Sequence, residues 1–147
     1  DRFLEPGDEV LDLGSGSGIL SIAAARLGAS RVVAVEYDVD ANINARENIE
    51  RNGVGAKIEL IERLADANLI AELGAFDIVL ANILSSVIRP LLPALAAAIG
   101  PRDGVLIVSG ILASEAADVV ADARSAGLEV LAEDREEEWW SAGLGRV

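Results

Sequence analysis

The sequence predicts an α/β fold built on a doubly wound, mostly parallel sheet. Short apolar runs alternate with longer amphipathic ones, and Gly, Pro, Asp and Asn fall between them. The first apolar run ends in a glycine-rich turn that opens a helix. Repeated strand-helix units of this kind give parallel sheets with helices on both faces. At 147 residues the chain has the length of one domain, so residues 1–147 are expected to form a single one.

The first half of the chain predicts three strands and two helices. Gly28 is expected to stop the first helix, and Asp40 is expected to cap the second. The strands are predicted at residues 9–13, 31–36 and 57–62, and the helices at residues 18–27 and 40–52.

The second half continues the alternation and ends in a hairpin. The run over residues 76–81 is continuously apolar, as in a central strand that is buried on both faces. Pro90 and Pro93 are expected to interrupt a helix over residues 84–99. The other elements are predicted as helices at 67–73 and 114–126 and strands at 105–109, 128–134 and 138–147. A charged break at residues 135–137 separates the last two strands, so one of them must run antiparallel.

Composition excludes several functional classes. The formal net charge is −13, and the only lysine, Lys57, and eleven arginines are spread along the chain, so direct nucleic-acid binding is not expected. Histidine and cysteine are absent, and no metal site is expected. No apolar run reaches the roughly 18 residues of a membrane span. The acidity either steers a basic protein partner toward the site or serves only solubility or adaptation to salt.

A glycine-rich turn follows the first predicted strand, in the run Val10-Leu11-Asp12-Leu13-Gly14-Ser15-Gly16-Ser17-Gly18. The three glycines of the run lack side chains, so a ligand can approach the backbone of this turn, Ser15 included, where the first helix begins. The turn therefore predicts a nucleotide-type site.

Two cofactors compete for this turn. The NAD fingerprint Gly-x-Gly-x-x-Gly requires a third glycine at position 19 or 21, where the sequence has Ile19 and Ser21. Asp12 places a carboxylate near the turn, which repels phosphates but suits the positively charged amino group of a methionine moiety. Both observations favour S-adenosylmethionine over NAD.

Acidic residues after the next strands are candidates for the nucleoside. Glu36 lies 22 positions after Gly14, where a carboxylate can accept hydrogen bonds from both ribose hydroxyls; the alternative is a solvated strand end. Tyr37 either packs against the adenine or is a surface aromatic. Glu62 or Asp66, after the third strand, is expected to accept a hydrogen bond from the adenine amino group.

Asn82 ends the fourth predicted strand and is the candidate on the acceptor side. The carboxyl ends of central strands face the ligand crevice in a doubly wound sheet. The Asn82 oxygen is expected to orient an acceptor amine, making Asn82 the catalytic candidate; the alternative is a helix N-cap before residue 83. Because the sulfonium methyl is already activated, orientation and desolvation supply most of the rate, and the lack of histidine is no objection.

Four segments together resemble the PrmA family, which methylates ribosomal large-subunit protein eleven. They are Leu11 to Leu20, Ala81-Asn82-Ile83-Leu84, Ser109-Gly110-Ile111-Leu112 and Glu137-Glu138-Trp139-Trp140. The resemblance covers essentially the whole chain. It implies a seven-stranded Rossmann-like sheet with its last strand antiparallel, and methyl transfer to lysine ε-amines and an N-terminal α-amine of a cytoplasmic protein. The family's cofactor positions correspond to Asp12, Gly14, Gly16, Gly18, Glu36 and Asn82.

The chain departs from this family in three ways. Ser15 stands where the family commonly has cysteine, and Glu36 stands where it commonly has aspartate. The family's N-terminal substrate-recognition domain and its Gly-Thr-Gly-x-His-Pro-Thr-Thr segment are expected to be absent from this chain. Two alternatives therefore stay open: a methyltransferase with another protein or a small molecule as acceptor, and a cofactor-binding module that is inactive without its upstream segment.

Overall fold

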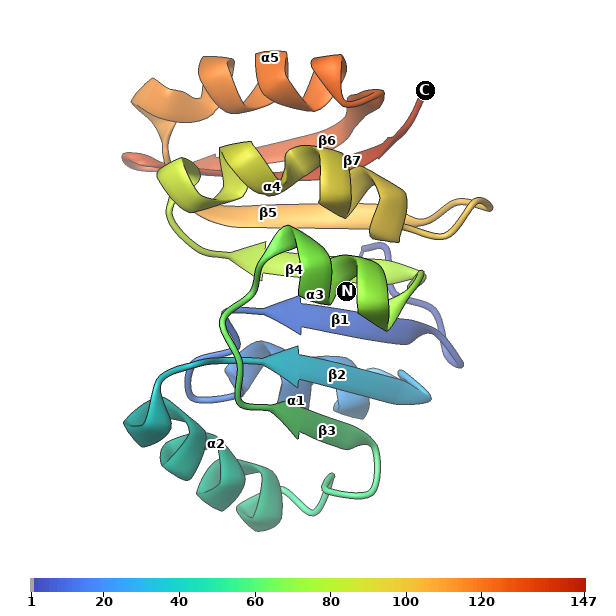
Figure 1. Cartoon of the computed structure of the whole chain (residues 1–147), viewed down its shortest axis with the longest axis vertical. Helices are drawn as coiled ribbons and strands as arrows, with labels where there is room; N and C mark the ends of the chain where they lie inside the picture. The colour runs from blue at the N-terminus through green and yellow to red at the C-terminus, as the bar shows by residue number, and fades with distance from the viewer. Residues whose placement is uncertain (1) are drawn as a thin grey trace. The chain divides into compact units, whose positions relative to one another are not determined.

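The computed structural model describes residues 2–147, and their contacts cluster into two compact units, Asp1–Ala65 and Asp66–Val147 (Figure 1). The first unit contains three strands and the second contains four, which gives the seven strands that the resemblance implied. Each unit is a sheet covered by its own helices. The expectation that the whole chain forms one domain stays a prediction.

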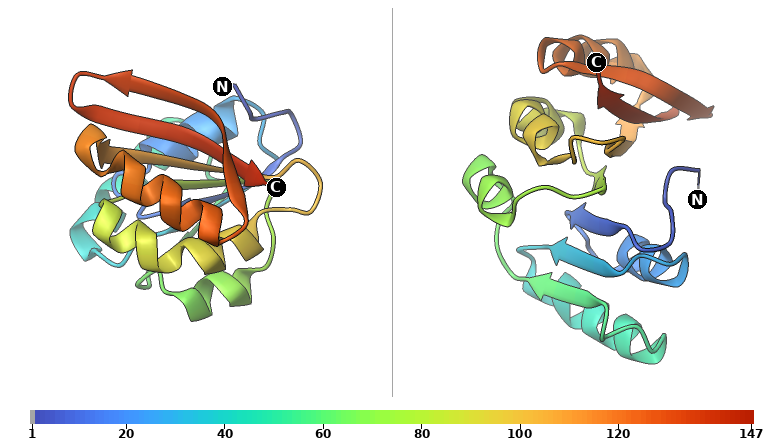
Figure 2. Two further views of the ribbon diagram at one scale, coloured as in Figure 1. Left: turned by 90° about the horizontal axis from the view of Figure 1, so that it is seen from above. Right: turned by 90° about the vertical axis from the view of Figure 1, so that its right-hand side faces the viewer.

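The first unit is a three-stranded parallel sheet in the order β3-β2-β1. Both helices lie on the same face of these strands (Figure 2). Leu13 pairs with Val35 in the register, so β1 and β2 end at the same edge of the sheet. The elements are β1 (Glu9–Leu13), α1 (Ile19–Arg26), β2 (Arg31–Val35), α2 (Val39–Arg51) and β3 (Ile58–Ile61).

The expected cap of α2 at Asp40 is wrong, because the cap residue lies two positions earlier, at Asp38. Asp38 has an extended backbone, and its Oδ1 accepts a hydrogen bond of 3.0 Å from the amide of Ala41. This is the geometry of an N-cap residue. Asp40 lies within the first turn, where its negative charge interacts favourably with the helix dipole.

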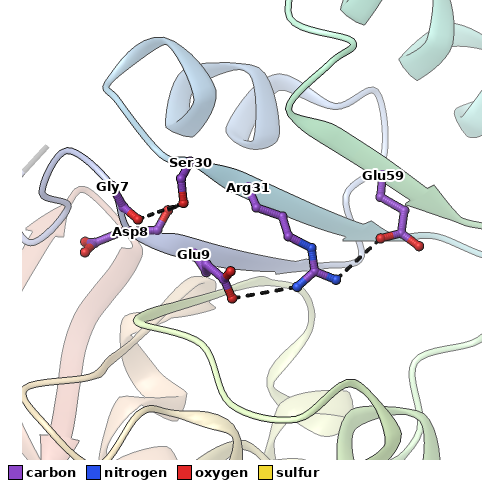
Figure 3. Close-up of polar contacts among 6 residues, drawn as sticks. All are labelled: Gly7, Asp8, Glu9, Ser30, Arg31 and Glu59. Atoms are coloured by element: carbon purple, nitrogen blue, oxygen red, sulfur yellow. Dashed lines mark hydrogen bonds and ion pairs between the residues drawn. The ribbon is translucent and has the colours of Figure 1, made fainter.

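Arg31 links the three strands of the first unit at their amino-terminal ends. Its guanidinium lies 3.7 Å from the carboxylate of Glu9 on β1 and 3.5 Å from that of Glu59 on β3 (Figure 3). Beside it, the Ser30 hydroxyl donates to the carbonyl oxygen of Gly7 at 2.7 Å. These contacts fix the edge of the sheet opposite to the glycine-rich turn.

The second unit is a four-stranded sheet in the order β4-β5-β7-β6. Strands β4 and β5 are parallel, whereas β7 runs antiparallel to both of its neighbours, as predicted. Its helices lie together on one face of the sheet (Figure 2). The elements are α3 (Ala67–Leu73), β4 (Ile78–Asn82), α4 (Ser85–Ala98), β5 (Val105–Leu112), the 3-10 turn η1 (Ala113–Glu115), α5 (Ala116–Ser125), β6 (Leu128–Glu136) and β7 (Trp139–Arg146).

The expected interruption of α4 by two prolines is wrong. The helix continues through Pro90 and Pro93, and both prolines are exposed to solvent. A proline removes one backbone hydrogen bond, and at an exposed position water can satisfy the carbonyl that loses its partner. Ile88, Leu92 and Leu95 are fully buried on the opposite side of the helix, and their packing holds it together.

The C-terminal hairpin confirms the expected strand pair but not the charged break. β6 continues to Glu136, and only Glu137 and Glu138 form the turn. Charged residues suit β6 because it is an edge strand with exposed side chains. On β7, Trp140 is 1% exposed and packs in the core, whereas the neighbouring Trp139 is 47% exposed, as alternation along a strand requires.

No helix among the described residues is long and apolar enough to span a membrane.

Candidate functional site

The turn between β1 and α1 has a backbone that only glycine adopts easily. Gly14, Gly16 and Gly18 have positive φ values of 68°, 55° and 85°, in the left-handed region that disfavours other residues. The amides of Gly14 and Ser15 donate to the carbonyl oxygen of Val35, at 2.8 and 3.1 Å. The end of β2 therefore anchors the turn, and its glycines leave the backbone open to a ligand.

Glu36 follows β2 directly and faces the same turn. Its Oε1 accepts a hydrogen bond of 3.1 Å from the amide of Gly16, and its Oε2 accepts one of 3.0 Å from the amide of Asp38. Each carboxylate oxygen has a second lone pair, so Glu36 can still accept two hydroxyl donors. This arrangement fits a ribose at the position where the sequence predicts one.

Asp12 lies beneath the turn rather than on its surface. It is 1% exposed, and its Oδ2 accepts a hydrogen bond of 2.6 Å from the Ser21 hydroxyl on α1. Burial raises the pKa of Asp12 to about 6; the hydrogen bonds from Ser21 oppose this shift, and the charge of Glu36 adds to it. The predicted contact between Asp12 and a ligand amino group stays a prediction.

The charged residues near the turn in two stretches of the sequence are all acidic. Residues 12–25 and 36–45 include Asp12, Glu36, Asp38 and Asp40 but no lysine or arginine. A pyrophosphate would meet repulsion here, whereas a sulfonium with a free ammonium group would be attracted. Tyr37 is 67% exposed beside Glu36, where its ring is open to a flat ligand, and its predicted packing on adenine stays a prediction.

The two candidates for the adenine amino group are each engaged elsewhere. Glu62 pairs with Arg46 of α2. Asp66 caps α3, and its Oδ1 accepts a hydrogen bond of 2.8 Å from the amide of Leu69. Asp66 is the first residue of the second unit. A contact from Asp66 to the nucleobase stays a prediction, and its structural role is that of a helix cap.

Asn82 ends β4 in the second unit, and its side chain is exposed. The alternative interpretation as a helix cap is wrong, because α4 begins at Ser85 and is preceded by Leu84 as its N-cap residue. Gly110 approaches Asn82 at a bulge in β5: a Cβ on Gly110 would lie 2.6 Å from the Asn82 Oδ1. The bulge residue must be glycine for Asn82 to keep this orientation.

Three residues that support the site were not predicted. Asp38 caps α2 and donates its amide to Glu36, while Asn42 and Asn48 on α2 donate to the carbonyl oxygens of Glu36 and Ser17. The two asparagines are six positions apart, about 120° around the helix, so no simple helical period in the sequence marks them as a pair.

Comparisons with known proteins match nearly the whole chain. The family model described as ribosomal protein L11 methyltransferase (PrmA) matches residues 1–145. A ribosomal protein L11 methyltransferase from Pelotomaculum thermopropionicum is 44% identical over 95% of this chain, and one from Geobacter sulfurreducens is 46% identical over 90%. The chain spans 44% and 42% of these two relatives, less than half of their length.

A solved structure with the same fold supports this match. The crystal structure of a ribosomal protein L11 methylase from Lactobacillus delbrueckii subsp. bulgaricus is 31% identical and has a TM-score of 0.89, over 99% of this chain and 72% of that one. This likeness confirms the predicted Rossmann-like α/β class with a seven-stranded, mostly parallel sheet. A precorrin-8w decarboxylase from Methanobacterium thermoautotrophicum, 21% identical with a TM-score of 0.79 over 99% of this chain and 86% of that one, shares the fold alone.

Proposed function

The chain belongs to the ribosomal protein L11 methyltransferase family, and we propose that it is the S-adenosylmethionine-binding core of a protein N-methyltransferase. Its acceptors are amino groups, a lysine ε-amine or an N-terminal α-amine, of a basic ribosomal protein in the cytoplasm. The net charge of −13 supports a basic partner, because opposite charge speeds the encounter.

The observation that carries the proposal is the pairing of the glycine-rich turn with Glu36. Three positive-φ glycines open the backbone at the end of β1, and a carboxylate from the end of β2 lies 3.1 Å from the Gly16 amide. The four charged side chains of residues 12–25 and 36–45 are all carboxylates, and Arg46 on α2 pairs with Glu62, which favours a positively charged nucleoside over a dinucleotide. Both features belong to the first unit, so this part of the site is formed by residues 1–65 alone.

The chain's own residues would bind the cofactor and orient the acceptor amine, rather than activate either of them chemically. When bound, S-adenosylmethionine would supply a methyl group on a positively charged sulfur: a neutral amine would form a bond to the methyl carbon as the sulfur–carbon bond breaks, the thioether would leave, and the methylated amine would lose a proton to solvent. Glu36 would hold the ribose, and the backbone of the turn would hold the amino-acid portion. Asn82 would accept a hydrogen bond from the acceptor amine and so direct its lone pair, which makes orientation the main contribution of the protein.

Calorimetry with S-adenosylmethionine and with NAD tests the cofactor assignment. We expect the chain to bind S-adenosylmethionine, and Glu36→Ala to weaken this affinity at least tenfold, because two ribose hydroxyls lose a charged acceptor. Glu47→Ala removes an exposed carboxylate from α2 and is the matched control, with unchanged affinity expected. Binding of NAD without binding of S-adenosylmethionine would show that the assignment is wrong.

Methyl transfer to purified ribosomal protein L11 tests the acceptor assignment. Asn82→Ala is expected to slow transfer at saturating cofactor while leaving the cofactor affinity within about twofold. An unrelated basic protein of similar charge serves as the control acceptor. A variant with full turnover would remove the role given to Asn82, and transfer to the control at the same rate would show that L11 is not the specific acceptor.

A further inference from the structure

One face of α2 contacts both the glycine-rich turn and the backbone of Glu36. Asn42, Ala45 and Asn48 are spaced by three, so they are neighbours along one side of the helix. This face meets the peptide after β2 at one end and the glycine-rich turn at the other. The inference drawn from it rests on the proposed function.

Asn48 holds the turn. Its side-chain Nδ2 donates to the carbonyl oxygen of Ser17 at 3.0 Å, and this carbonyl belongs to the same planar peptide unit as the amide of Gly18. The Gly18 amide in turn donates to the carbonyl oxygen of Ser15 at 2.9 Å. The peptide between Ser17 and Gly18 is therefore fixed on both sides, and with it the entry of the chain into α1.

Asn42 holds the backbone of Glu36. It is 1% exposed, and its Nδ2 donates to the backbone carbonyl oxygen of Glu36 at 2.9 Å. The Oδ1 of the same amide is buried without a hydrogen-bond partner among the described residues. A buried amide with an unsatisfied oxygen is unfavourable compared with an apolar residue, so packing alone does not account for asparagine at this position.

Ala45 lets the helix approach the turn closely. It is fully buried, and a Cβ on Gly18 would lie 3.4 Å from the Ala45 Cβ. A larger side chain at position 45 would push the turn away from α2. The small residue therefore brings the two amides within reach of their carbonyls.

We propose that the face of α2 formed by Asn42, Ala45 and Asn48 is a positioning element for S-adenosylmethionine. Among these three residues, Asn48 contributes most to the affinity for the cofactor. This face holds the turn and Glu36 in the ligand-binding geometry before the cofactor arrives. Binding then requires no ordering of the turn, so the free-energy cost of ordering does not lower the affinity. The three residues touch the protein rather than the ligand, so they act through Ser17, Gly18 and Glu36.

Calorimetry on Asn48 variants tests this proposal. Asn48→Ala removes the donor, and Asn48→Asp replaces it with an acceptor that repels the Ser17 carbonyl, so we expect about tenfold and more than tenfold weaker binding of S-adenosylmethionine, respectively. Asn44→Ala, an exposed asparagine on the same helix, is the control with unchanged affinity. If Asn48→Ala and Asn48→Asp bind like Asn44→Ala while Glu36→Ala loses affinity, the positioning role is refuted and the proposed function stands. If the unmodified chain does not bind, both fail.

Amide hydrogen exchange in the cofactor-free protein separates positioning from a general loss of stability. In Asn48→Ala we expect the Gly18 amide to exchange about tenfold faster, because its peptide is released locally. The amide of Val33, in the buried centre of β2, should keep its exchange rate. Equal acceleration at Gly18 and Val33 would mean global destabilisation and would overturn the proposal.

Discussion

Replacing Asp12 by asparagine should stabilise the cofactor-free protein at neutral pH. The Asp12 carboxyl is 1% exposed, and the Ser21 hydroxyl is its hydrogen-bond donor. Burial disfavours its charged form and raises its pKa from 3.8 to about 6. Asparagine has nearly the same shape and an oxygen that can accept the Ser21 hydrogen bond, so the variant removes the buried charge and little else.

The size and sign of the effect follow from this shift. The folded-state pKa lies above the unfolded-state value, so the folded protein binds the proton more tightly. The associated stability is fully present below about pH 4 and is lost as the pH rises through 6. A difference of about two pKa units corresponds to about 3 kcal/mol in the free energy of unfolding. Above pH 7 the wild-type chain carries this cost, and Asp12→Asn does not.

Urea unfolding between pH 4 and pH 8 measures the effect. We expect Asp12→Asn to be about 1–3 kcal/mol more stable than the wild type at pH 7.5, with the difference shrinking toward zero near pH 4. Taking the difference between the two proteins cancels the titration of the other carboxylates. Asp40→Asn, which removes an exposed charge, is the control for the loss of a carboxylate as such. A constant difference across this range would refute the buried, proton-binding role of Asp12.

Three further predictions follow from individual contacts. Gly110→Ala should slow methyl transfer without changing cofactor affinity, because its Cβ would displace the Asn82 amide; turnover and calorimetry check this. Asp38→Ala should cost about 1 kcal/mol in urea unfolding, since it removes the cap of α2, and Asp40→Ala should cost less. Trp140→Ala should lower the free energy of unfolding by about 3–5 kcal/mol, because the indole is buried and its N–H donates to the Glu133 carboxylate. A urea midpoint equal to that of the wild type would contradict the place of Trp140 in the core.

The fold was predictable because its local signals agree with one another. The apolar run at Val10 and Leu11 is fully buried in β1, and the alternation of Trp139 and Trp140 places one ring in the core, as expected. The errors arose where two local signals competed. Asp38 and Asp40 both suit a helix cap, and the choice between them depends on where β2 ends. Proline disfavours the interior of a helix, but in α4 the packing of the opposite face outweighs this local preference.

Only the residues that would contact the cofactor directly could be predicted from the sequence. The glycine-rich turn and Glu36 follow from spacing along the chain. Asn48 bonds to Ser17 across 31 positions, and such a contact depends on how α2 packs against the turn, which the local pattern does not specify. The burial of Asp12 depends on how the turn and α1 cover the end of β1, and so its raised pKa required the structure.

The most direct test of the central claim is an NMR titration of the backbone amides with S-adenosylmethionine. Gly16 and Asp38 donate to the Glu36 carboxylate, so both amides report on ligand bound between the glycine-rich turn and β2. We predict that these amides, with Gly14 and Gly18, show the largest shifts. Saturable binding that leaves all four unchanged, or that shifts only residues of the second unit, would contradict the assignment of the cofactor to this turn.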